Sequence, residues 1–68
     1  MDDNVKWYLT GVKELLISKY NLDKNLAAEI ISRSYILPVI ALFPEECLHD
    51  DIEGVVDNIY QDYTEGRL

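Results

Sequence analysis

Apolar residues near the C-terminus recur with the spacing of one face of an α-helix, and this pattern constrains the fold more than any other feature. The run starts at Ile52 and continues 3, 4, 7, 8 and 11 positions later. These offsets define one stripe, because an α-helix has about 3.6 residues per turn. The pattern predicts an amphipathic helix over residues 51–64, and Asp50 with Glu53 three residues later indicates a start that resembles a capping box. The members of the stripe are Ile52, Val55, Val56, Ile59, Tyr60 and Tyr63.

Two similar stripes lie nearer the N-terminus and predict helices over residues 4–20 and 24–35. Asn21 follows the first of them, and asparagine tolerates the left-handed conformation in which helices often end. We therefore expect a tight turn between these two helices. The first stripe consists of Val5, Tyr8, Leu9, Val12, Leu15, Leu16 and Tyr20. The second consists of Leu26, Ala27, Ile30 and Ile31.

Residues 36–43 are apolar on nearly every side. Pro38 suits the first turn of a helix, where the N–H groups have no partner within the helix, and it disfavours a central strand. We expect a bend near residues 35–37 and a short buried helix over 38–43; a buried strand is the alternative. The chain is thus predicted to be a single all-α domain, 1–68, with three amphipathic helices around a short buried one.

The segment 43–54 contains the only cysteine, Cys47, and the only histidine, His49. Structural zinc sites need four ligands, mainly cysteine and histidine, so one chain offers too few, and only a symmetric dimer could supply two of each. The pair is also badly spaced for a thiol–imidazole catalyst, because residues two apart on a helix point in different directions. We expect no catalytic residue, no cofactor and, within one chain, no metal site.

The net charge of −7 is concentrated in residues 41–68, where eight acidic residues face a single arginine. A negative field repels the phosphates of nucleic acids and anionic lipids, and it attracts basic protein surfaces. Direct nucleic-acid binding and binding to a membrane surface are therefore not expected. A partner protein with a basic surface fits this charge.

Four of these acids are spaced to form a ridge along the last helix and the turn before it: Glu46, Asp50, Glu53 and Asp57. No lysine stands four residues from them to offset their repulsion. The ridge is interpreted either as a solvated face or as a partner-binding site. In the second case it docks on a basic protein, or it mimics the phosphates of DNA and inhibits a nucleic-acid-binding protein.

Trp7 lies on the side of the first helix away from its apolar stripe, together with Gly11 and Ser18, and with Ile17 at the flank. Residues 36–43 or the second helix could cover this side within the chain. Alternatively, Trp7 anchors self-association, because a core this small often needs support from a partner. The sequence leaves both interpretations open.

The chain begins with acidic residues and has no signal-peptide pattern, and its longest apolar run, 35–43, is far shorter than the roughly 20 residues that span a bilayer. One cysteine cannot form an internal disulfide, which fits a reducing compartment. A cytoplasmic location is expected.

Over roughly residues 5–63 the chain resembles small uncharacterised acidic helical proteins of Gram-positive bacteria and their phages and plasmids. The residues concerned are Trp7-Tyr8-Leu9-x-Gly11, Pro44-Glu45, His49 and Asp51-Ile52-Glu53. The resemblance implies an all-helical fold and assigns no activity or site. The function expected from the residues is a non-enzymatic protein–protein interaction or regulatory module that self-associates. DNA mimicry is the first alternative, and a metal-dependent role of a dimer is the second.

Overall fold

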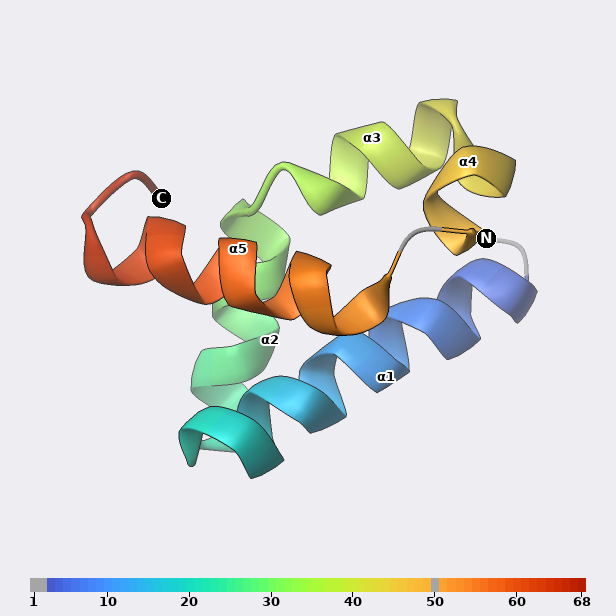
Figure 1. Ribbon diagram of the computed structural model, residues 1–68. Coiled ribbons are helices and arrows are strands. Elements are labelled where there is room, and N and C mark those ends of the chain that lie inside the picture. Colours follow the sequence, from blue (N-terminus) through green and yellow to red (C-terminus); the bar gives the residue numbers. More distant parts are fainter. Residues whose placement is uncertain (1–2, 50) are drawn as a thin grey trace.

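In a computed structural model, which describes residues 3–49 and 51–68, the described chain consists of helices and connecting turns, without a strand. The all-helical fold class is therefore confirmed (Figure 1). The helices are α1 (Asp3–Tyr20), α2 (Lys24–Arg33), α3 (Ile36–Leu42), α4 (Pro44–Leu48) and α5 (Ile52–Thr64).

The helix ends follow local backbone chemistry. Asn21 adopts the left-handed conformation, with φ of 56°, and ends α1 as the sequence indicates. The last helix begins one residue later than expected, at Ile52, because its N-cap is Asp51 rather than Asp50. The Asp51 carboxylate accepts a hydrogen bond of 3.2 Å from the backbone N–H of Glu53, which satisfies one of the free donors of the first turn. Asp50 lies outside the described residues.

The helix that contains Pro38 begins two residues earlier than expected, at Ile36. Pro38 thereby occupies the third position of α3, still within the first turn, where its missing N–H removes no helical hydrogen bond. The preceding helix, α2, ends at Arg33 instead of residue 35, because Ser34 is extended and its side-chain hydroxyl donates to the Ile31 carbonyl oxygen at 2.8 Å.

The core draws on every helix. Buried apolar side chains of α1 and α5 face each other along their length, and Val12, Leu16, Val56 and Ile59 have no exposed surface. The remaining members are Val5, Tyr8, Ala27, Ile30, Ile31, Ile36, Ile40, Cys47 and Val55. Helix α1 contacts α2, α4 and α5, so the first helix lies at the centre of the packing.

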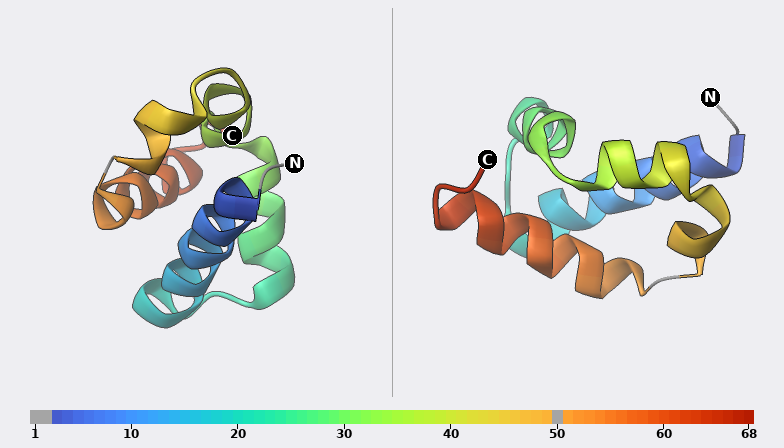
Figure 2. Two further views of the ribbon diagram at one scale, coloured as in Figure 1. Left: turned by 90° about the vertical axis from the view of Figure 1, so that its right-hand side faces the viewer. Right: turned by 90° about the horizontal axis from the view of Figure 1, so that it is seen from above.

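The expected arrangement around a short buried helix is not confirmed. Helix α3 packs mainly on α2 and α4, and Figures 1 and 2 show it lying across the top of the α1–α5 pair. It buries Ile36 and Ile40 but exposes Pro38, Ala41 and Leu42. A helix of two turns on the outside of a bundle buries one stripe, and its other residues face solvent even when they are apolar.

Among the described helices, none is by itself long and apolar enough to cross a membrane. Helices α2 and α3 are long and apolar enough for this only when they are taken together, and they are bent by 60° relative to each other. The apolar stripes of this pair, with Ile30 and Ile36, are packed into the core.

Candidate interaction surfaces

Cys47 and His49 occupy different environments at the end of α4. The Cys47 side chain is 2% exposed and belongs to the core, whereas His49 is exposed at the C-cap. In the described part of the chain, no three histidine, cysteine or carboxylate side chains are grouped to hold a metal ion. A thiol turned into the core packs as a small apolar group.

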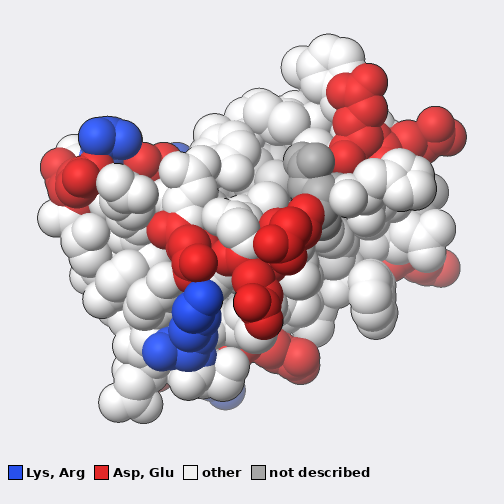
Figure 3. Space-filling view, viewed as in Figure 1, with Lys and Arg blue, Asp and Glu red and all other residues white. Residues whose placement is uncertain are grey.

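The acidic ridge runs over two helices. Glu46 lies on α4, and Glu53 and Asp57 lie on α5; all three are exposed, while Asp50 is outside the described residues. Figure 3 shows acidic side chains clustered over α5 with a basic side chain beside them, and further acidic side chains over α4.

Asp57 does not stand as an isolated acid in this ridge. Its Oδ1 atom lies 2.8 Å from Lys19 Nζ, and the Tyr20 hydroxyl donates a hydrogen bond to the same oxygen. The hydrogen bonds from Lys19 and then from Tyr20 hold the pKa of the Asp57 carboxyl below its usual value. The hydrogen bond to Asp57 in turn raises the pKa of Lys19 and that of Tyr20.

The sequence did not indicate this ion pair, because its partners are 38 residues apart. The rule of charges four residues apart applies only to pairs within one helix, and Lys19 and Asp57 lie on different helices. Tyr20 also stacks on Tyr60 with ring centroids 3.8 Å apart and an angle of 6° between the rings. This cluster fastens the last turn of α1 to α5.

Trp7 is 75% exposed, so neither α2 nor α3 covers it within the chain. Its expected neighbours divide into two groups. Ser18 is exposed, whereas Ile17 is partly buried and packs against the core. Gly11 faces α5, since a Cβ atom placed there would lie 2.9 Å from the Cδ1 atom of Ile52. The structure leaves Trp7 as an exposed aromatic side chain and uses Gly11 for close packing inside the chain.

A second exposed apolar site lies at the corner between α3 and α4, where the apolar run 36–43 predicts buried residues. Leu42 is 74% exposed and Phe43 is 53% exposed. They line a shallow hollow of about 290 Å³ together with Pro44, Glu45 and Glu46. The only sequence signal for this exposure was the length of the nine-residue apolar run, since a helix that packs on one side cannot bury such a run completely.

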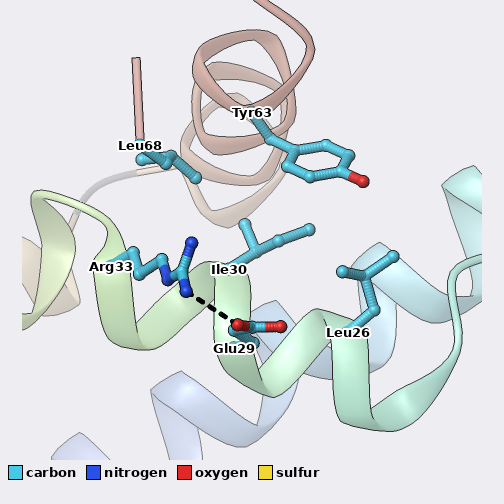
Figure 4. Close-up of a pocket in the computed structure, with 6 residues that line it drawn as sticks. All are labelled: Leu26, Glu29, Ile30, Arg33, Tyr63 and Leu68. Carbon is cyan, nitrogen blue, oxygen red and sulfur yellow. Dashed lines mark ion pairs between the residues drawn. The ribbon is translucent and has the colours of Figure 1, made fainter. Parts of the chain in front are cut away.

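A smaller hollow of about 160 Å³ lies between α2 and α5. Figure 4 shows Leu26, Ile30 and Tyr63 around it, with the guanidinium group of Arg33 directed at Glu29. Leu68 closes one side of this hollow. The Arg33–Glu29 ion pair is 2.9 Å long and occupies the charged groups of the site. The volume of this hollow is below the roughly 300–1,000 Å³ typical of small-molecule pockets.

Comparison of the chain with protein-family models, with curated proteins and with solved structures finds no match.

Proposed function

We propose that this chain is a non-enzymatic protein–protein interaction module that binds through exposed apolar side chains and self-associates. The observation that carries this proposal is the exposure of Trp7, Leu42 and Phe43, each with more than half of its surface in solvent. The same chain buries smaller apolar side chains, such as Val12 and Val56, completely. Large apolar groups left outside a well-packed core are typical of binding surfaces when they gather at one place, as Leu42 and Phe43 do in one hollow.

Self-association is assigned to Trp7. Burial of its exposed part, 75% of the side chain, in an interface would contribute about 3–5 kcal/mol, because an aromatic side chain buries roughly 150–250 Å² at about 25 cal/mol per Å². The net charge of −7 opposes contact between two copies. Salt screens this repulsion, so self-association should become stronger as ionic strength rises.

Analytical ultracentrifugation at micromolar protein and several salt concentrations tests self-association. We expect a dimer that is weakened about tenfold or more by Trp7→Ala, as for an aromatic residue at the centre of an interface. Asn58→Ala, an exposed polar change on α5, is the control and should leave the dissociation constant unchanged. A monomer at every concentration, or equal dimerisation of both variants, would contradict the assignment to Trp7.

Acidic DNA mimicry is the second candidate function, and the observation that favours it is the exposure of Glu45, Glu46, Asp51 and Glu53. The ion pair of Asp57 with Lys19 interrupts the row, and this favours a basic protein partner over a regular imitation of phosphates. The test is release of nucleic-acid-binding proteins of the source cell from immobilised DNA. Mimicry predicts that one of them is displaced, and displacement of none would end this candidate.

A further inference from the structure

We propose that the corner between α3 and α4 docks a short segment of a partner protein in which an apolar side chain is flanked by lysine or arginine. This inference rests on the proposed interaction function and specifies the chemistry of one partner. The docking site consists of the hollow lined by Leu42, Phe43, Pro44, Glu45 and Glu46.

The backbone of this corner is held from both sides. Phe43 ends α3, where its N–H donates to the Val39 carbonyl oxygen at 2.8 Å. The Phe43 carbonyl oxygen accepts from the Cys47 N–H at 3.1 Å, which begins α4. Cys47 and Ile40 are buried beneath the corner and anchor both helices to the core. The exposed side chains therefore extend from a fixed backbone, which reduces the entropy lost when a partner binds.

The apolar part of the hollow is formed by adjacent residues. Leu42 and Phe43 are 74% and 53% exposed and line the same hollow, so a single apolar side chain of a partner can contact both. The hollow is shallow and far smaller than a standard protein–protein interface, which fits a short segment bound at micromolar affinity.

The charged part of the hollow specifies a basic occupant. Glu45 and Glu46 are exposed beside the apolar residues. Within the described residues, the basic side chains that form ion pairs are directed at other acids; they are Lys19, Arg33 and Arg67. The carboxylates of Glu45 and Glu46 thus lack a cation among the described residues, and a lysine or arginine of a partner can supply it.

A second copy of this chain is a poor occupant of the same site. In a two-fold symmetric contact the same patch meets itself, so Glu45 and Glu46 of both copies would be brought together. The charge of −7 on each copy adds to this repulsion. Phosphates of nucleic acids or lipids would be repelled by the same carboxylates. Charge complementarity therefore selects a basic protein segment.

The test uses the whole chain and three fluorescein-labelled synthetic peptides, with binding measured by fluorescence anisotropy. The first peptide has a central Leu-Phe pair flanked by lysines, the second replaces the lysines with glutamates, and the third replaces the Leu-Phe pair with serines. We expect micromolar binding of the first peptide, weakened by salt, and at least tenfold weaker binding of the other two.

Three protein variants locate the binding. Leu42→Ala and the double variant Glu45→Gln/Glu46→Gln should each weaken binding of the first peptide about tenfold. Glu14→Gln, which neutralises an exposed acid on α1, is the matched control and should leave it unchanged. NMR shifts caused by the first peptide should centre on residues 42–46.

Equal affinity of the Glu45→Gln/Glu46→Gln variant and the wild type, or NMR shifts centred on Glu53 and Asp57, would overturn the proposal. Loss of self-association in Leu42→Ala would overturn it as well, since the occupant would then be a second copy. If the Trp7-dependent dimer forms but no peptide binds at the corner, this inference fails while the proposed function stands. A monomeric protein that also fails to bind the peptide would contradict both this inference and the proposed function.

Discussion

Lys19 Nζ lies 2.8 Å from Asp57 Oδ1, and this ion pair joins the last turn of α1 to the middle of α5. Both side chains are nearly half exposed, and the Tyr20 hydroxyl donates to the same carboxylate oxygen. Asp57 therefore connects the two main helices through an ion pair and a hydrogen bond, and its carboxylate is not free to bind a partner as the ridge interpretation requires.

Asp57→Asn should lower the melting temperature slightly, because it removes the charge that Lys19 and Tyr20 bind. Glu14→Gln is the control: it removes one exposed negative charge from α1 without breaking an ion pair among the described residues, so it should leave the melting temperature nearly unchanged. Thermal unfolding followed by circular dichroism at low salt measures both. Equal melting temperatures would show that the ion pair contributes nothing.

The difference in unfolding free energy between wild type and Asp57→Asn should depend on pH at both extremes. The pKa of Asp57 is lowered from 3.8, so the folded state binds fewer protons than the unfolded state near that pH. Its stabilisation is present above pH 3.8 and is lost as pH falls through the lower folded value. The pKa of Lys19 is raised from 10.5 and that of Tyr20 from 10.0, so their stabilisation is lost as pH rises above these values.

Urea titrations from pH 2.5 to 11 measure this difference. It should be constant between about pH 5 and 9 and should decrease towards both ends. A difference that grew on acidification would contradict the direction of the shift at Asp57.

Gly11→Ala tests the close approach of α5 to α1. Alanine favours the helix by about 1 kcal/mol over glycine, but its Cβ would lie 2.9 Å from the terminal methyl group of Ile52. Ile52→Val removes that methyl group. We expect Gly11→Ala to stabilise the Ile52→Val protein by about 1 kcal/mol and to stabilise the wild type less, as measured by urea unfolding of the four proteins. Equal effects in both backgrounds would contradict the contact.

Leu16→Ala and Leu42→Ala remove the same atoms from opposite environments. Leu16 is 0% exposed and Leu42 is 74% exposed. The first change should cost about 3 kcal/mol, a large part of the roughly 3–10 kcal/mol expected for a chain of this size. The second should change the free energy of unfolding by less than about 0.5 kcal/mol. A large destabilisation by Leu42→Ala would place Leu42 in the core and contradict the exposed corner.

The Cys47 thiol should react slowly with an aromatic disulfide reagent, because the side chain is 2% exposed. Its rate should rise with urea in parallel with unfolding. The double variant Cys47→Ala/His49→Cys moves the thiol to an exposed position two residues away, where rapid reaction is expected in the absence of urea. Fast reaction of the wild type would indicate an accessible thiol and would reopen a metal or catalytic role.

The helices were readily predicted because their signals are local. The stripe that starts at Val5 and the one that starts at Ile52 each bury the expected side of a helix, although Tyr63 at the end of the second stripe is 39% exposed. Asn21 ends α1 as its side chain suggests. The errors fall at helix ends. Asp50 was expected to begin the last helix, and the cap is Asp51, since adjacent acids compete for one position and the backbone conformation selects between them.

The candidate sites were harder to predict, because exposure depends on what lies on the other side of a helix. The apolar run 36–43 was expected to be buried, yet Leu42 and Phe43 face solvent where α3 meets α4. Trp7 was left open between burial and exposure, and it is exposed. Gly11 was grouped with Trp7 as part of a partner surface, whereas it receives Ile52 of the same chain.

The sequence by itself determined the all-helical fold, the apolar stripes and the concentration of negative charge in the last third of the chain, since these follow from periodicity and composition. Only the tertiary structure decided that α1 is the central helix, that Lys19 neutralises Asp57, and that the apolar corner at Leu42 is left uncovered. The physical reason is that pairing and exposure depend on contacts between residues distant in the sequence, which no local pattern records.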